Sequence, residues 1–559
     1  MVLLFFSSIW AVHAQYFGRY KPGYKKFDYK VYETPNFEIY HYFKNDSLIH
    51  HYAILAEKWY DLHSIIFQDE IEKKNPLLLY SNHADFQQTN AVSSIISVGT
   101  GGVTEVLKNR VVMPVSFAYS QTDHVLGHEL VHAFQFNLLV SGEDSTNTNS
   151  LRNLPLWMVE GMAEYMSIGS VDANTAMWIR DALINDYFPT LEDLNKDPRY
   201  FPYRYGQSFW SMVTKKWGDD VIRPLFSTTA KFGYKRAIDS VLGVSPKTFS
   251  GMWKSANENY YKPFLKDSVE AQYGNKILFA ENAGEVNVSP SISPDGKYVI
   301  FLSEKDLFSL DLFLAEANTG EIIKKISSTV HRNEIDAFNY LESSGTWSPD
   351  SKQFAFVVFT KGINKLVIVD VEKAKIVRET EIKHVPSFSN PAWSPDGNKI
   401  LFTGLVDGVP NLYIYHLENG KINQLTHDLY SYLMPQWSPN GEIIVFATDK
   451  NPGKSLPAHH FNIGLIDLSQ SKRVNIIDVF HGANNLNPVF SSDNSNIYFL
   501  SDRDGFRNLY RHNLDSSKTY QLTEFITGIS GITPFSPALS ISRDHDVLSY
   551  SHDFNEKYS

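Results

Sequence analysis

Residues 392–404 read AWSPDGNKILFTG, in which a Pro-Asp-Gly turn separates two short apolar segments. Similar segments occur six times after residue 275, and turns of this composition connect neighbouring strands. The residues in the proline position are 44 to 55 residues apart and are Pro294, Pro349, Pro395, Pro439, Ser492 and Arg543. A period of about 40 to 50 residues is typical of propeller blades. The sequence therefore predicts an all-β propeller of about six blades over residues 275–559, with a sandwich of six hairpins as the alternative.

The sixth copy, LSISRDHDVLSYS (539–551), predicts an incomplete blade, because only two strands fit before residue 559. We expect NKILFA (275–280), or sequence outside this chain, to complete it. Together the repeats resemble those of TolB-like propellers over nearly all of residues 275–559. The resemblance implies a propeller that binds a protein or peptide, or that restricts access to a neighbouring site.

The length, net charge and cysteine content of the chain exclude several classes of function. The chain has 559 residues, of which 43% are hydrophobic, and this length predicts several domains. Its net charge is −11 and it has no long Lys/Arg run, which argues against a nucleic-acid partner or an anionic membrane surface. The absence of cysteine excludes disulfides and thiolate metal sites. Any metal must therefore be held by histidine and carboxylate.

The first fourteen residues, MVLLFFSSIWAVHA, are apolar and end in small residues, as a cleaved signal peptide does. A basic segment is missing at the start, so a buried strand is the alternative. No later run reaches the roughly 18 apolar residues of a membrane helix. We expect no transmembrane segment in the mature chain and an exported protein, which is periplasmic, attached to the cell envelope or secreted.

Residues 15–270 have a different pattern, with strands first and helices after. KVYETPNFEIYHY (30–42) predicts two strands around a turn, and residues 46–67 have helical apolar spacing. NPLLLYSN (75–82) and NRVVMPVSF (109–117) predict further strands, and the helical period dominates from residue 123. This half of the chain is therefore expected to be an α+β domain.

GHELVHAFQF (127–136) carries His128 and His132 four residues apart, which places both imidazoles on one face of a helix. With Glu129 they form the H-E-x-x-H pattern, in which the histidines bind Zn²⁺ and the glutamate acts as base. A catalytic zinc has three protein ligands, so a third ligand must come from elsewhere. The alternative is an ordinary amphipathic helix.

A second predicted helix, LPLWMVEGMAEYMSIG (154–169), supplies the third ligand. Glu160 and Glu164 lie one turn apart on one face among apolar neighbours. We assign Glu160 as the metal ligand and Glu164 as the acceptor of a hydrogen bond from a ligand imidazole. The alternative is two glutamates on a solvated helix face.

HELVH followed by WMVEGMAEY resembles the gluzincin clan of zinc metallopeptidases, the peptidase MA-like domains, over about residues 30–265. The resemblance implies an α+β thermolysin-like metallopeptidase domain, Zn²⁺ held by His128, His132 and Glu160, and Glu129 as general base and acid. It also implies that the strand at 109–117 is a sheet edge that pairs with substrate.

Two finer expectations concern specificity and the oxyanion. GTGGVTEVLKN (99–109) lacks the Gly-x-Met-Glu-Asn order of the aminopeptidase branch, so an endopeptidase is favoured over an aminopeptidase. Within YFPYRYGQSFW (200–210), Tyr205 directly precedes a predicted helix and is our candidate oxyanion donor, with aromatic packing as the alternative. His124 is expected to be a surface or capping residue.

The sequence thus predicts an exported zinc metallopeptidase that cleaves a peptide or protein substrate. Zinc would lower the pKa of its bound water to about 7, and Glu129 would take the proton and pass it to the leaving amine. The propeller would filter substrate or bind a protein partner at the cell envelope. The alternative is an inactive peptidase scaffold that acts through its propeller as a protein-binding module; a hydrolase of a non-peptide bond also remains open.

Overall fold

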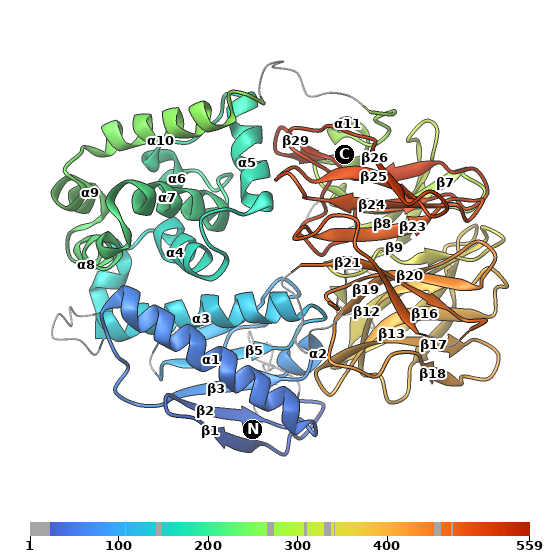
Figure 1. Cartoon of the computed structure of the whole chain (residues 1–559), viewed down its shortest axis with the longest axis horizontal. Coiled ribbons are helices and arrows are strands. Elements are labelled where there is room, and N and C mark those ends of the chain that lie inside the picture. Colours follow the sequence, from blue (N-terminus) through green and yellow to red (C-terminus); the bar gives the residue numbers. More distant parts are fainter. Residues whose placement is uncertain are drawn as a thin grey trace, which may run out of the picture.

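A computed structural model describes residues 23–106, 108–140, 148–264, 273–306, 310–328, 337–339, 341–451, 460–470 and 473–559. The expected signal peptide, residues 1–14, lies outside this range. Among the helices described, none combines the length and the hydropathy of a membrane span. A helix-rich N-terminal region lies beside a β-propeller formed by the C-terminal half of the chain (Figure 1).

The N-terminal region begins with a five-stranded sheet in the order β1-β2-β3-β5-β4. The strands are β1 (Lys30–Glu33), β2 (Phe37–His41), β3 (Asn75–Tyr80), β4 (Val103–Glu105) and β5 (Arg110–Pro114). β2, β3 and β5 are parallel, and β1 and β4 are antiparallel edge strands. The predicted strands are confirmed, but the expectation that the strand at 109–117 forms the sheet edge is wrong. The short strand β4 pairs with β5 and is itself the edge.

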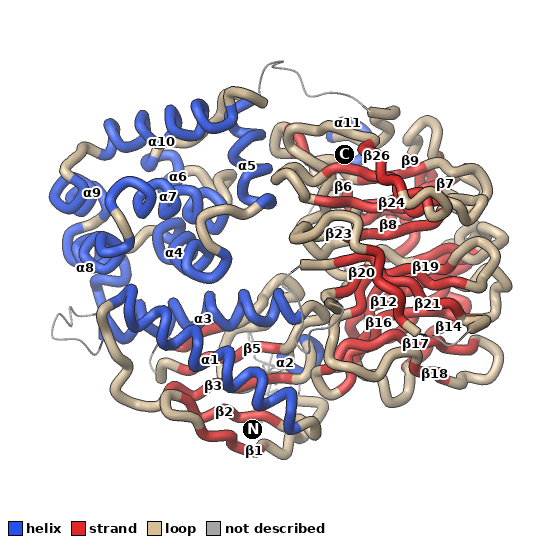
Figure 2. Tube along the Cα trace, in the orientation of Figure 1, coloured by secondary structure: helices blue, strands red, loops and turns tan. Residues whose placement is uncertain are grey.

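Helices cover this sheet and extend beyond it (Figure 2). They are α1 (Asp46–Phe67), α2 (His83–Phe86), α3 (Tyr119–Val140), α4 (Leu156–Ile168), α5 (Ala173–Ile184), α6 (Leu191–Lys196), α7 (Pro202–Trp217), α8 (Ile222–Phe232), α9 (Tyr234–Leu242) and α10 (Pro246–Tyr261), with short 3-10 turns at Thr148–Asn153 and Asp219–Val221. α3 contacts α1, α4, β4 and β5. The helix predicted at 46–67 is confirmed.

Contacts with α1 fix the rotation of α3. Gly127 of α3 lies against the Trp59 ring so closely that a Cβ atom there would be 2.8 Å from it. The Trp59 indole donates a hydrogen bond to Asp123 (2.7 Å), and His63 Nε2 lies 2.9 Å from the Gly127 carbonyl oxygen. The apolar side of α3, including Leu130, faces the core, so the opposite side is left for polar residues.

The C-terminal half contains five blades of four or five strands, in which each strand pairs antiparallel with its neighbour. The short helix α11 (Ala280–Ala283) precedes them. The blades are β6 (Asn287–Ile292), β7 (Tyr298–Ser303), β8 (Asp311–Glu316) and β9 (Ile322–Ser327); β10 (Ala337–Phe338), β11 (Thr346–Trp347), β12 (Gln353–Thr360), β13 (Ile363–Asp370) and β14 (Lys375–Glu381); β15 (Ser387–Trp393), β16 (Lys399–Val406), β17 (Val409–His416) and β18 (Ile422–Gln424); β19 (Tyr432–Trp437), β20 (Ile443–Thr448), β21 (Asn462–Asp467) and β22 (Val474–Ile477); and β23 (Asn485–Phe490), β24 (Asn496–Ser501), β25 (Asn508–Asn513) and β26 (Lys518–Gln521).

The sixth repeat forms only the two-stranded sheet β27 (Leu539–Ile541) and β28 (Leu548–Tyr550), which contacts β6. The hairpin β29 (Asp553–Phe554) and β30 (Lys557–Tyr558) follows it. The segment 275–280 does not complete this sheet, since residues 275–279 form no strand. Leu278 instead belongs to the apolar cluster of the first blade. The expectation that this segment supplies a strand is wrong.

The Pro-Asp-Gly turns are held by their own side chains. In the third blade the Ser394 hydroxyl accepts a hydrogen bond from the Lys399 amide (2.9 Å) and donates one to Asp396. Gly397 has a φ of +76°, a conformation that favours glycine. The predicted structural role of these residues fits these contacts.

The opposite end of the propeller contacts the N-terminal region. The Asp407 carboxylate accepts the backbone N–H groups of Lys44 (2.8 Å) and Asn45 (3.1 Å). Arg180 of α5 donates to the carbonyl oxygens of Ile526 (2.5 Å) and Thr527 (3.2 Å). The Ser431 hydroxyl accepts a hydrogen bond from the first backbone N–H group of α3. Ser431 lies just before β19, whereas the Pro-Asn-Gly turn of that repeat lies at the other end of β19. The turn-bearing face of the propeller therefore points away from the helices.

Candidate metal centre

His128 and His132 of α3 and Glu160 of α4 bring three possible ligand atoms together. His128 Nε2 lies 3.2 Å from His132 Nε2 and 3.2 Å from Glu160 Oε2. His132 Nε2 lies 3.3 Å from the same carboxylate oxygen. A tetrahedral ion about 2.0–2.1 Å from each ligand requires ligand atoms roughly 3.3–3.4 Å apart. The two imidazoles and one carboxylate therefore fit zinc in both chemistry and spacing.

Each histidine has a partner for its other ring nitrogen. His128 Nδ1 lies 3.0 Å from Glu164 Oε1, and His132 Nδ1 lies 2.9 Å from Gln135 Oε1. Gln135 is itself fixed, because its amide nitrogen donates to the Val159 carbonyl oxygen (3.1 Å). Such partners leave Nε2 as the metal-binding nitrogen of each ring. The sequence predicted Glu164 for this position and missed Gln135.

The histidine and glutamate side chains of the cluster shift one another's pKa. Burial alone would lower the pKa of His128, but its hydrogen bonds to Glu160 and Glu164 raise it to about 10. Burial would raise the pKa of Glu160, yet the two histidines hold it well below its usual range. Positive charge between these side chains is thus strongly favoured, and a divalent cation supplies it without protonating the ligands.

Glu129 lies between the ligand pair and the edge strand β4. It is 6% exposed, and its Oε2 is 2.7 Å from the Thr104 hydroxyl of β4. A Cβ atom on Gly102 would lie 2.7 Å from the Glu129 side chain, so only glycine leaves room for it there. The sequence analysis considered residues 99–109 only for aminopeptidase specificity and did not assign Gly102 or Thr104 to the surroundings of Glu129, although the pair Gly101-Gly102 was a usable signal.

Tyr203, and not Tyr205, lies beside the cluster. The Tyr203 ring stacks on His128 with centroids 5.9 Å apart and an interplanar angle of 14°. Burial and then the charge and hydrogen bond of Glu160 raise its pKa above the usual value. Tyr205 is 1% exposed and packs edge-to-face on Tyr200, with ring centroids 5.3 Å apart. The structure thus places the predicted oxyanion donor in an aromatic core.

A close crossing of α4 and α7 brings Tyr203 to this position. A Cβ atom on Gly161 would lie 2.2 Å from Gly206, and one on Gly206 would lie 2.0 Å from the Trp157 carbonyl oxygen. Only a pair of glycines permits this separation. The same crossing places Arg204 Nη1 3.4 Å from Glu164 Oε2, which adds a cation behind the His128 partner.

His124 is part of the cluster and not a surface residue. Its side chain is 20% exposed, and its Nε2 lies 3.3 Å from Glu164 Oε1. His124, His128 and Glu164 form a second set of possible ligand atoms. That set would use His128 Nδ1, which is the nitrogen already paired with Glu164. The expectation of a surface or capping role is wrong, because α3 begins at Tyr119, so that His124 lies within the helix one turn before His128 and contacts Glu164.

Comparison with known proteins identifies the propeller. Residues 313–476 match the sequence model of the TolB beta propeller domain. The search of curated proteins gave no match. The chain is similar to TolB from Acinetobacter baumannii at 19% identity and a TM-score of 0.35, which covers 43% of this chain and 55% of that chain.

Two further solved structures show similar levels of likeness. The putative TolB from Agrobacterium tumefaciens has 21% identity and a TM-score of 0.37, over 48% of this chain and 91% of that one. The β-propeller domain of the Trilobed protease from Pyrococcus furiosus has 20% identity and a TM-score of 0.33, over 48% and 75%. The TolB-like propeller assignment rests on the family match together with the observed blades.

Proposed function

We propose that this chain is an exported zinc-dependent metallopeptidase with a TolB-like propeller. The observation that carries the proposal is the mutual spacing of 3.2–3.3 Å among the ligand atoms of His128, His132 and Glu160. Two imidazoles and a glutamate on facing helices are the ligand set of a large class of zinc peptidases. We extend the proposal to a thermolysin-like N-terminal domain and to a propeller with an incomplete sixth blade.

Zinc held by His128, His132 and Glu160 would supply a Lewis acid that makes water more acidic and polarises a carbonyl group. Glu129 accepts the proton of the attacking water and passes it to the leaving amine. The Thr104 hydroxyl donates a hydrogen bond to the Glu129 carboxylate, and Gly102, which has no Cβ atom, leaves room for the Glu129 side chain. The Tyr203 hydroxyl donates a hydrogen bond to the oxygen that becomes negatively charged.

Substrate is proposed to bind as an extended strand along β4. Among the described residues this strand pairs only with β5, and it carries Thr104 next to Glu129. Strand addition to an exposed edge recognises backbone rather than one side chain, which suits an endopeptidase. The propeller restricts access of substrate or binds a protein partner in the periplasm or cell envelope.

The proposal is tested by metal content and proteolysis of the full chain. We expect about one zinc per chain in the wild type and in Glu129→Gln, since Glu129 is not a ligand. Cleavage of casein should fall by 10² to 10⁴ in Glu129→Gln, which is the usual range for loss of a general base. The matched control is Glu258→Gln, which changes a partly exposed glutamate of α10 and should leave cleavage unchanged.

Three results would contradict the proposal. Protein without stoichiometric zinc, even after zinc is supplied, would support the inactive scaffold instead. Equal cleavage by wild type and Glu129→Gln would remove Glu129 from the mechanism. Zinc-loaded protein that hydrolyses esters but no peptide would assign the site to another bond.

A further inference from the structure

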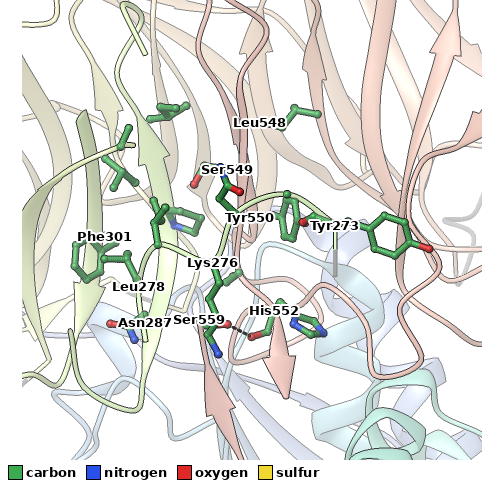
Figure 3. A pocket seen from close by; sticks show the side chains of 18 of the residues that line it. Tyr273, Lys276, Leu278, Asn287, Phe301, Leu548, Ser549, Tyr550, His552 and Ser559 are labelled. Atoms are coloured by element: carbon green, nitrogen blue, oxygen red, sulfur yellow. Dashed lines mark hydrogen bonds between the residues drawn. The ribbon is translucent and has the colours of Figure 1, made fainter. Parts of the chain in front are cut away.

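Two pockets of the molecule lie outside the metal centre. One separates the first blade from β28, with Leu278 on one side and Tyr550 on the other (Figure 3). The other lies between α4, α5, α7 and α10, and Tyr165 and Lys215 are among the residues that line it. Among the described residues that line these pockets, none is a proposed zinc ligand. Recognition of a substrate side chain next to the cleaved bond must therefore come from residues around the ligands themselves.

A row of aromatic rings leads from His128 to the protein surface. The Tyr203 ring stacks on His128, and the Phe201 ring stacks on Tyr203 with centroids 5.0 Å apart and an interplanar angle of 25°. Trp178 of α5 packs against Phe201 with centroids 5.8 Å apart. We call Tyr203, Phe201 and Trp178 the aromatic row. Tyr203 and Trp178 are half-buried, whereas Phe201 is 41% exposed. The row therefore presents an open phenylalanine ring close to the metal centre.

The position of Phe201 does not suit its residue type. Phe201 is the N-cap residue of α7, and its side chain makes no capping hydrogen bond. Serine, threonine, asparagine and aspartate are preferred there, because their side-chain oxygen accepts a free N–H group of the first turn. Other helices of this region follow the preference, and their capping residues are Asn45, Asn82, Asp172, Thr190 and Ser245. Capping does not account for Phe201, and its partly open ring gains only part of the free energy of full burial. These two features point to a role in binding.

The aromatic row and the strand edge β4 approach the metal centre from different sides. Tyr203 stacks on His128, while the next residue of α3, Glu129, is bonded to Thr104 of β4. The centroid of Phe201 is at most about 11 Å from that of His128, since the two stacking distances add to no more than that. An extended peptide advances about 3.3–3.6 Å per residue. A substrate cleaved at this centre can therefore place a side chain on Phe201 from within about three residues of the cleaved bond.

We propose that the open face of Phe201, together with Trp178, selects an aromatic side chain of the peptide substrate near the cleaved bond. The inference rests on the proposed peptidase function, whose substrate class it names. An aromatic side chain extends the row by offset stacking or edge-to-face packing, which adds to the free energy of apolar burial. Phe201 is then a residue that determines specificity, while Glu129 and Tyr203 keep their proposed roles in the reaction.

The test compares two quenched fluorescent peptides of glycine, serine and lysine that differ only in a central phenylalanine or alanine. With the zinc-loaded full chain, we expect kcat/KM to be roughly 3- to 10-fold higher for the phenylalanine peptide, as the free energy of one aromatic pair implies. Mass spectrometry should place the cleaved bond within three residues of the phenylalanine. Phe201→Ser should remove most of the preference, and its hydroxyl can cap α7. Phe201→Trp, which keeps a ring, should retain the preference. The matched control is Phe232→Ala, which removes a phenylalanine that is 55% exposed at the end of α8 and should also retain it.

Peptide binding separates this inference from the proposed function. Fluorescence anisotropy of the same two peptides, without the quencher, measures their binding to Glu129→Gln in the absence of cleavage. The phenylalanine peptide should bind more tightly than the alanine peptide, and adding Phe201→Ser to Glu129→Gln should remove the difference. If the wild type cleaves neither peptide but this binding difference is found, the proposed function fails and the aromatic subsite stands. Equal affinity of Glu129→Gln for both peptides overturns the subsite. Equal loss of cleavage of both peptides in Phe201→Ser also overturns it, because Phe201 would then only support Tyr203.

Discussion

At the scale of single residues, Tyr203 and Tyr205 separate two accounts of the site. They point to nearly opposite sides of α7, about 160° apart, since a helix turns about 100° per residue. We expect Tyr203→Phe to lower kcat/KM by roughly 10²- to 10³-fold, the usual cost of losing one oxyanion donor, with zinc content unchanged. Tyr205→Phe, which removes a hydroxyl from an aromatic core, should retain nearly full kcat/KM. The reverse order would restore Tyr205 as the donor.

The sequence identified the proposed ligand residues but not their surroundings. His128, His132, Glu160 and Glu164 follow from helical spacing alone, because residues four apart share a face. The rotation of α7 about its axis decides which of the two tyrosines faces the cluster. This rotation is fixed by the contact between Gly161 of α4 and Gly206 of α7, which are far apart in the sequence. The position of Gly206, three residues after Tyr203 and on the same face, was the available signal.

At the scale of elements, the crossing of α4 and α7 holds the site together. Gly206→Ala would place a methyl group about 2.0 Å from a backbone oxygen of α4, so the helices must separate. We expect a loss of about 1–3 kcal/mol in the free energy of unfolding, as for overpacked cores, and a marked loss of activity, because Tyr203 moves with α7.

Gly251→Ala on α10 is the matched control for this prediction. A Cβ atom there meets nothing within 4 Å, and alanine favours a helix over glycine by up to about 1 kcal/mol. This variant should be as stable as the wild type or slightly more stable, with normal activity. Chemical denaturation and casein cleavage of both variants provide the measurements. A Gly206→Ala protein that is fully stable and active would show that the crossing is not critical.

Elements that depend on long-range pairing were the hardest to predict. The repeated turns identified the propeller because each turn is specified locally by its own serine, aspartate and glycine. The edge strand β4 has three residues and no apolar alternation, so only its pairing with β5 reveals it. The segment 275–280 is apolar enough for a strand, but Leu278 packs on the first blade.

At the scale of the whole molecule, a buried carboxyl group lies where the propeller contacts α3. Ser431 accepts the Tyr119 amide (3.0 Å), and its own amide donates to Asp449 (2.7 Å). Burial and, to a lesser degree, the charge of Asp428 raise the pKa of Asp449 to about 7, against the opposing hydrogen bonds of Ser431. The folded protein therefore keeps a proton on Asp449 at pH values where the unfolded chain has lost it.

This raised pKa predicts how stability depends on pH. The proton stabilises the folded state below pH 4, and this contribution is lost as pH rises through about 7. As pH rises from about 4 to about 7, Asp449→Asn should therefore become more stable relative to the wild type, by up to a few kcal/mol. Above about pH 7 the difference in stability should stay constant. Melting curves across this range provide the measurement. A difference in stability between the two proteins that does not change with pH would show that Asp449 titrates alike in the folded and unfolded states.

The central claim is that one zinc ion is held by His128, His132 and Glu160, and anomalous diffraction at the zinc absorption edge tests it most directly. The account predicts a single peak at about 2.0–2.2 Å from Nε2 of both histidines and from a carboxylate oxygen of Glu160. A peak between His124, His128 Nδ1 and Glu164, or no peak in zinc-supplemented crystals, would contradict it.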